Sequence, residues 1–290
     1  MEKHLLSESG PEVSAAIYGF WRWEQELQDT DLLTSVVEEC QQLGITSFDL
    51  NNPNGTEQVE KSFGKLIKTG AVQREDVVIA ARAGWQKNKH SGKLYADLSQ
   101  ESIRSTVDQL LKNLGTDYVD VLLLHDFDPL FNAEETASVL TDLVLKRKIH
   151  YIGLSNFNVF QHKLLSAHLS IPVVTNHIEL SVLQTDAIRD GRLDLIREQY
   201  SKPLALAPLA GGRILTGTDA RTTAIRSLLA EIAERYSANV EQVAVAWLYK
   251  LQALPIIGSL DLQRIRNAAS AHTITLSNED WHLIYEFVKS

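Results

Sequence analysis

Several side chains able to do acid–base and anion chemistry stand at the ends of apolar runs in this sequence. They include Asp49, Arg82, His125, Ser155 and His177. A carboxylate and a guanidinium can pair, an imidazole can move a proton near neutral pH, and a serine hydroxyl can both donate and accept hydrogen bonds. If the fold brings these residues together, they form a site that binds and polarises a small polar ligand.

These residues allow two other interpretations. Asp49 and Arg82 could form an ion pair whose role is purely structural, and His125 could be a histidine of the core. A metal site is not expected, because Asp49, His125 and His177 lack the close spacing typical of metal ligands.

Eight short β-rich runs alternate with segments of helical period along the whole chain. The expected strands are residues 14–19, 45–50, 77–82, 119–125, 149–155, 173–179, 204–209 and 254–259. Between them, apolar residues recur at helical spacing, as in residues 103–114, where Ser99 is a suitable N-cap and Gly115 a suitable stop.

This alternation predicts an α/β fold, a (β/α)8 TIM barrel that spans residues 1–290 as a single domain. Strands that read as nearly continuous apolar runs are typical of parallel sheets covered by helices, and eight of them close a barrel. A doubly wound open sheet is the alternative, but no GxGxxG pattern follows the first expected strand. In a TIM barrel the polar residues at the strand ends meet at one mouth.

The composition narrows the function classes. The 290 residues are 44% hydrophobic and 22% charged, which fits a globular protein. The 28 Lys and Arg against 37 Asp and Glu give a net charge of −9, so we expect neither nucleic acid nor an anionic membrane as a partner. Cys40 is the single cysteine, and no apolar run reaches the length of a membrane span, so we expect a cytoplasmic protein.

The chain resembles the aldo-keto reductases, and most closely a bacterial branch of that family. Eight segments carry the resemblance in the right order: GFWR (19–22), GITSFD (44–49), Glu60 with Phe63 and Gly64, LGTDYVD (114–120) leading to His125, IGLSNF (152–157), PLAGGR (208–213), QVAVAWL (242–248) and PIIGS (255–259). The family transfers a hydride from NADPH to an aldehyde or ketone. It uses an Asp, Tyr, Lys and His tetrad in which tyrosine is the proton donor.

The resemblance implies a catalytic set of Asp49, Asn54, Arg82 and His125, in which half of the tetrad is replaced. Asn54 stands where the family has the tyrosine, and an amide can donate a hydrogen bond but releases no proton near neutral pH. Arg82 stands where the family has the lysine, and it can still pair with Asp49. His125 is the one proton donor left at the matched positions. Unless His125 acts as the donor, carbonyl reduction should slow by roughly 10²–10⁴-fold.

The resemblance also implies an NADPH site and a substrate pocket. Cofactor-binding residues carried over from the family are Ser155, Asn156, His177, Leu206, Gly211, Gly212, Arg213, Ser259 and Arg264. Ser259 and Arg264 match positions that hold the 2′-phosphate, and His177 replaces a glutamine of the family. Leu206 replaces an aromatic residue that stacks on the nicotinamide, and Gly258 stands where some members have lysine. Trp21 and Trp23 are the expected substrate-pocket residues.

These matches predict an NADPH-binding oxidoreductase that reduces a carbonyl or imine-type small molecule without the usual tyrosine acid. Hydride addition to an iminium ion gives a neutral amine directly, so such a substrate needs no proton donor. Two alternatives stay open. One is an NADPH-binding pseudoenzyme with a sensing or partner-binding role, and the other is a non-redox isomerase or dehydratase that uses the same pocket.

Overall fold

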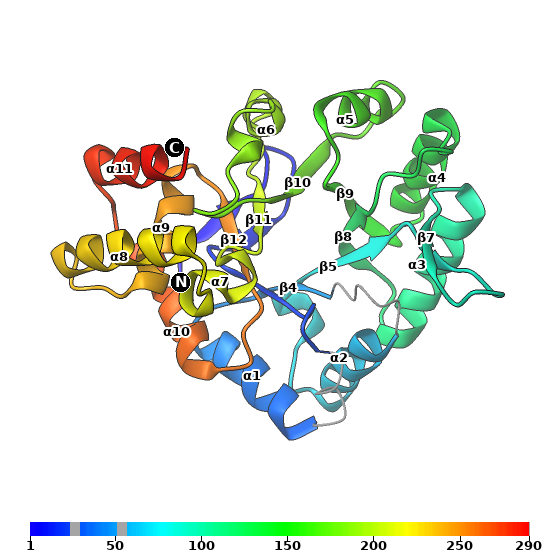
Figure 1. Cartoon of the computed structure of the whole chain (residues 1–290). Helices are drawn as coiled ribbons and strands as arrows, with labels where there is room; N and C mark the ends of the chain where they lie inside the picture. Colours follow the sequence, from blue (N-terminus) through cyan, green and yellow to red (C-terminus); the bar gives the residue numbers. More distant parts are fainter. Residues whose placement is uncertain (24–29, 51–56, 290) are drawn as a thin grey trace.

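Eight parallel strands close into a barrel within the residues that the computed structural model describes, 1–23, 30–50 and 57–289 (Figure 1). Around the barrel they are β3 (Ile17–Gly19), β4 (Ser47–Asp49), β5 (Val78–Ala83), β8 (Val119–Leu124), β9 (Ile149–Ser155), β10 (Val173–Glu179), β11 (Leu204–Leu206) and β12 (Leu254–Ile257). β12 pairs with β3, which closes the ring. The fold class is therefore the (β/α)8 barrel that the sequence predicts.

The expected strands all occur, and two have the predicted bounds, β9 and β10. Both are buried along nearly their whole length, so their apolar runs mark their ends clearly. β3 and β11 are three residues long, shorter than expected. The segment that follows β11 leaves the sheet, since Ala207 has a φ of 50°.

Helices cover the outside of the barrel (Figure 1). Their bounds are α1 (Thr30–Gln42), α2 (Gln58–Thr69), α3 (Gln100–Leu114), α4 (Ala133–Leu145), α5 (Val159–Ser166), α6 (Arg192–Glu198), α7 (Arg213–Thr216), α8 (Ala220–Arg235), α9 (Val240–Lys250), α10 (Leu262–Ser270) and α11 (Asn278–Lys289). The predicted caps of α3 are confirmed. The Ser99 hydroxyl accepts from the backbone N–H of Ser102, and Gly115 ends the helix at a φ of 67°.

Two short antiparallel hairpins, which the alternating pattern does not predict, flank the barrel. β1 (Lys3–Leu5) pairs with β2 (Glu12–Ser14), and β6 (Trp85–Lys87) pairs with β7 (Leu94–Ala96). Leu6 and Val13 of the first hairpin pack against the first residues of several barrel strands, so this hairpin covers the N-terminal end. The chemistry of the barrel is left to its opposite end.

The barrel interior changes from apolar to polar along its axis. Near the N-terminal end it holds residues such as Val121 and Leu254, whereas the C-terminal end holds Asp49, Ser155 and His177, all buried. Among the described residues, no helix is long and apolar enough to cross a membrane.

His162, on α5, is a buried histidine remote from these residues. Its side chain is 1% exposed, and neither ring nitrogen has a hydrogen-bond partner among the described residues. Burial lowers the pKa of His162 to about 4 from 6.5. The neutral ring therefore contributes fully to stability above pH 6.5, and this contribution is lost as the pH falls from 6.5 to 4.

As the pH falls from 6.5 to 4, protonation of His162 should lower the free energy of unfolding of the unmutated chain. The variant His162→Leu lacks this loss, so its free energy of unfolding should fall by less, with a difference of up to about 3 kcal/mol. Urea denaturation at a series of pH values measures the difference. His168→Leu is the control, because His168 is exposed. If the two variants show the same dependence on pH, protonation of His162 does not destabilise the fold.

Candidate active site

The polar residues singled out in the sequence meet at the C-terminal end of the barrel strands. Asp49 ends β4, Arg82 lies next to the end of β5, His125 follows β8 and Ser155 ends β9. Because all the strands are parallel, these four positions come to the same mouth. His177, on β10, lies opposite Ser155 in the sheet register.

Asp49 and Arg82 form the ion pair that the sequence predicts. Arg82 Nη2 lies 3.2 Å from Asp49 Oδ2, and the side chains are 7% and 2% exposed. A buried charge is costly unless it is paired and hydrogen-bonded, so each side chain needs the other. The pair fixes the guanidinium in the floor of the mouth.

Ser155 links this pair to His125. Arg82 Nη1 donates to Ser155 Oγ at 3.2 Å, and His125 Nδ1 lies 2.9 Å from the same oxygen. One serine hydroxyl thus bridges the arginine and the histidine. The resemblance assigns this hydroxyl to the cofactor, but here protein groups already engage it.

His177 is fully buried next to the same guanidinium. Its Nδ1 lies 3.4 Å from Arg82 Nη2 and 3.7 Å from Asp49 Oδ2. Arginine can only donate, so Nδ1 accepts and the ring proton is placed on Nε2. His177 Nε2 and Asn176 Oδ1 have no hydrogen-bond partner among the described residues. Both atoms are buried polar groups that the described residues leave unsatisfied.

The surroundings of both histidines disfavour the imidazolium form. Burial, and then the charge of Arg82, lower the pKa of His125 to about 3. Burial and the same charge hold the pKa of His177 well below its usual value. At neutral pH His125 is a neutral imidazole, which can donate a hydrogen bond but is not an acid of matched strength.

Asn54, the residue in the place of the tyrosine, lies outside the described residues. Trp23 departs from the expectation of a substrate-pocket residue. Its side chain is 1% exposed, packs against Phe20 and donates from Nε1 to the Tyr18 hydroxyl at 3.0 Å. The indole nitrogen is satisfied inside the core, so Trp23 does not line the mouth.

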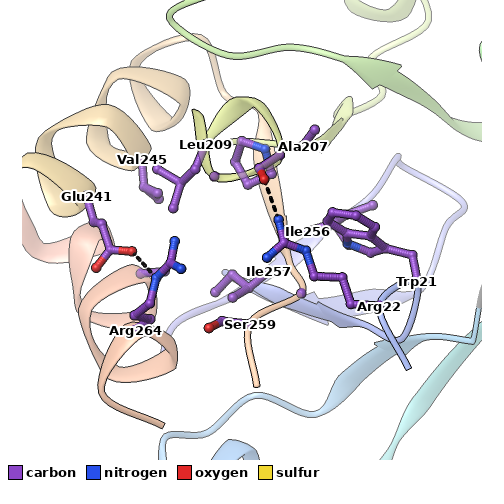
Figure 2. Close-up of a pocket in the computed structure, with 15 residues that line it drawn as sticks. Trp21, Arg22, Ala207, Leu209, Glu241, Val245, Ile256, Ile257, Ser259 and Arg264 are labelled. Atoms are coloured by element: carbon purple, nitrogen blue, oxygen red, sulfur yellow. Dashed lines mark hydrogen bonds and ion pairs between the residues drawn. The ribbon is translucent and has the colours of Figure 1, made fainter. Parts of the chain in front are cut away.

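Beside the ion pair, a cavity opens between the ends of β11 and β12 and helices α9 and α10 (Figure 2). It is lined by Trp21, Arg22, Ala207, Pro208, Leu209, Gly211, Gly212, Glu241, Val245, Ile256, Ile257, Gly258, Ser259, Arg264 and Ala268. Four of the expected cofactor residues are among them: Gly211, Gly212, Ser259 and Arg264. Trp21 also lines this cavity, where a Cβ on Gly258 would overlap its indole.

Two arginines face this cavity from opposite sides (Figure 2). Arg22 donates to the backbone oxygen of Gly211 at 2.6 Å and stacks on Trp21 at 4.4 Å. Arg264 donates from Nε to Glu241 Oε1 at 2.7 Å. Burial and then the charge of Arg264 lower the pKa of Arg22. Like charges that face one cavity attract an anion into it.

The loop after β11 offers backbone to a ligand. Gly211 and Gly212 have φ values of 69° and 97°, and a Cβ built on Gly211 meets no atom within 4 Å. A polar chain such as a pyrophosphate can therefore approach this backbone closely. The glycine loop and the two arginines fit the phosphates of a dinucleotide.

Other expected cofactor residues lie elsewhere. Ser155 and His177 belong to the ion-pair network, Asn156 is an exposed residue with a φ of 59°, and Leu206 ends β11. The Arg213 side chain is 64% exposed and lies 3.5 Å from Asp219. Arg213 is not among the residues that line the cavity, and its guanidinium contacts the carboxylate that caps α8.

Sequence reasoning missed two residues of the site. Glu241 resembles an ordinary acidic residue in the first turn of a helix, since Asn239 caps α9 two positions earlier. Trp85 lies in the unexpected hairpin, with its ring 6.0 Å from the ring of His125. The place of Glu241, one position before the matched segment QVAVAWL (242–248), is the one signal that could have marked it.

No group of His, Cys, Asp or Glu in the described part of the chain could hold a metal ion.

Comparison with known proteins identifies the family. A sequence model of a protein family, described as "Aldo/keto reductase family", matches residues 16–289. The chain belongs to the aldo/keto reductase family. Its mouth network and its arginine-lined cavity are thus features of an aldo/keto reductase barrel.

Three bacterial relatives cover nearly the whole chain. The oxidoreductase YcsN of Bacillus subtilis is 34% identical over 96% of this chain and 95% of its own. Oxidoreductase YdhF of Escherichia coli is 32% identical over 98% and 96%. A 6-dehydroglucose reductase of Agrobacterium fabrum is 33% identical over 98% and 97%. Together these names support an oxidoreductase.

A solved structure agrees with the fold. The thermostable aldo-keto reductase Tm1743, crystallised with the inhibitor epalrestat, superposes with a TM-score of 0.84 at 25% identity. The match covers 99% of this chain and all of the other.

The buried ion pair yields a stability prediction. We expect Asp49→Asn and Arg82→Met each to lower the free energy of unfolding by about 3 kcal/mol, because each leaves the partner's charge buried. The double variant should lose about 2 kcal/mol less than the sum of the two. Urea denaturation of the four proteins measures this coupling. Additive losses would mean that the two charges do not depend on each other.

Proposed function

We propose that this chain is an NADPH-dependent oxidoreductase that reduces a carbonyl or imine-type small molecule without a tyrosine acid. One observation carries the proposal: the buried Asp49–Arg82 network and the arginine-lined cavity open at the same end of the barrel. A hydride donor bound in the cavity and a substrate bound over the network would therefore be neighbours.

The cavity and the mouth suit different parts of NADPH. In this proposal Ser259 and Arg264, which line the cavity, hold the 2′-phosphate, and the Gly211–Gly212 backbone with Arg22 holds the pyrophosphate. At the mouth, Ser155, Asn156 and His177 are the candidates for the carboxamide, with Leu206 beside the ring. When bound, the reduced nicotinamide supplies a hydride.

The residues of the mouth can orient a substrate but supply a proton poorly. Arg82 and Asp49 polarise the floor, and the neutral His125 can donate one hydrogen bond to a substrate atom. Since the pKa of His125 is about 3, an imidazolium acid is scarce at neutral pH. Hydride addition to a ketone leaves an alkoxide that must be protonated, whereas addition to an iminium ion gives a neutral amine. The chemistry of the site therefore favours the iminium.

A second candidate is an NADPH-binding pseudoenzyme with a sensing or partner-binding role. Its support is that the Ser155 hydroxyl is engaged by both Arg82 and His125, while Asn54 replaces the proton donor. On this hypothesis the cavity binds the nucleotide and no turnover follows.

Cofactor binding gives the first test. We expect NADPH to bind more tightly than NADH, and Arg264→Ala to weaken NADPH by at least about tenfold and NADH by less than about twofold. Fluorescence titration of the reduced nucleotides measures both dissociation constants. Arg213→Ala is the matched control, because that guanidinium points to Asp219 instead of the cavity. Equal affinities for NADPH and NADH in the unmutated chain would contradict the proposed cofactor.

Turnover gives the second test. In stopped-flow single turnovers of the NADPH complex, we expect a cyclic iminium to be reduced faster than its isosteric ketone. Asn54→Tyr combined with Arg82→Lys restores the family's acid and its neighbouring lysine. This double variant should raise the ketone rate by roughly 10²-fold.

Three results would decide against the proposal or one of its parts. A ketone rate equal to or above the iminium rate in the unmutated chain contradicts the missing-acid argument. No gain in the double variant contradicts the assignment of position 54. NADPH binding without oxidation of NADPH by either substrate supports the pseudoenzyme.

A further inference from the structure

A carboxylate reaches into the cavity at the point where a phosphate is expected. Glu241, on α9, has a side chain that is 7% exposed, and its Oε1 accepts from Arg264 Nε at 2.7 Å. Its Oε2 accepts from Asn267 Nδ2 at 3.0 Å. Two neighbours thus hold the carboxylate in place, and Figure 2 shows it directed at the guanidinium of Arg264.

The Glu241–Arg264 pair uses only part of the guanidinium of Arg264. Its Nε is bound to Glu241, while its two terminal nitrogens make no hydrogen bond to any described residue and lie on the cavity side (Figure 2). The fork can therefore still donate to an oxyanion. However, the oxyanion would meet an Arg–Glu pair, whose net charge is zero. Because the carboxylate of Glu241 is buried, little solvent screens its negative charge.

From this geometry we infer that Glu241 is a specificity-determining residue that reduces the preference for NADPH over NADH. A 2′-phosphate carries up to two negative charges and is repelled by the carboxylate behind Arg264. A 2′-hydroxyl is neutral, and it can donate a hydrogen bond to a carboxylate. Glu241 therefore weakens the binding of NADPH and does not weaken that of NADH. This inference rests on the proposed function, since it assumes that the cavity holds the nucleotide.

The same contacts allow an opposite role, in which Glu241 helps NADPH by fixing the orientation of Arg264. Glutamine separates the two roles. Glu241→Gln keeps an oxygen that can accept from Arg264 Nε and keeps the volume, but it removes the negative charge. If the charge dominates, NADPH binds more tightly to this variant. If positioning dominates, its affinity is unchanged, and Glu241→Ala weakens NADPH.

The test is a fluorescence titration of NADPH and NADH against the unmutated chain, Glu241→Gln and Glu241→Ala. For Glu241→Gln we expect the dissociation constant of NADPH to fall by about tenfold and that of NADH to change by less than about twofold. Competition by 2′,5′-ADP and 5′-AMP should show the same contrast, which isolates the phosphate from the nicotinamide. Glu241→Ala removes the charge as well, so it should shift NADPH in the same direction but by less.

A second Arg–Glu pair, whose arginine lies on α10 as Arg264 does, supplies a matched control. Arg266 of α10 donates from Nε and Nη2 to Glu39 at 2.7 and 2.9 Å, and neither residue lines the cavity. Glu39→Gln thus breaks a similar Arg–Glu pair without changing the charge in the cavity. Glu39→Gln should leave the ratio of the dissociation constants of NADPH and NADH within about twofold of its value in the unmutated chain.

The outcomes separate the inference from the function on which it rests. If the unmutated chain binds neither nucleotide, the proposed function fails and the inference fails with it. If both nucleotides bind but Glu241→Gln leaves the preference for NADPH over NADH unchanged or weakens it, only the inference is overturned. Should Glu241→Gln fail to fold, Glu241→Ala decides alone, and weaker NADPH binding by that variant overturns the inference.

Discussion

Arg82 is the side chain on which the arrangement of the barrel mouth depends. Its guanidinium contacts Asp49, Ser155 and His177, and its side chain is 7% exposed. A buried cation needs a counter-charge and acceptors for its N–H groups, and residues of β4, β9 and β10 supply them to Nη1 and Nη2 of Arg82, whereas Nε has no partner among the described residues. The convergence of parallel strands makes this possible, because residues far apart in the sequence reach one guanidinium.

The same buried cation determines what the histidines can do. The charge of Arg82 adds to burial in lowering the pKa of His125 and of His177. A lysine there would carry a similar charge, but in the family it acts on a tyrosine, and this chain has Asn54 instead. Arg82 is paired with the Asp49 carboxylate, so the pair has no net charge, and neither histidine is an imidazolium at neutral pH. On the function proposed above, a site without an acid favours a substrate that hydride neutralises directly, such as an iminium ion.

The sequence predicts the barrel and the mouth network well, because both follow from strand periodicity. The bounds of β9 and β10 are as predicted, and Asp49, Arg82, His125 and Ser155 meet because the polar residue at each strand end marks the mouth. Other features depend on side-chain direction, which periodicity does not encode. An aromatic residue after a strand can turn outward to a pocket or inward to the core, and Trp23 turns inward. Arg213 follows two glycines and turns to Asp219.

The arginine-lined cavity and the buried ion-pair network are built from different sectors of the barrel. The cavity uses β11, β12, α9, α10 and the residues after β3, whereas the network uses the ends of β4, β5, β8 and β9 together with β10. Arg82, which the resemblance matches to the lysine of the family, belongs to the second sector alone. Glu241 changes the charge of the first sector alone. Each sector can therefore diverge without altering the contacts of the other. The proposed function fits this separation, since a change at the ion-pair network leaves Arg22 and Arg264 on the walls of the cavity.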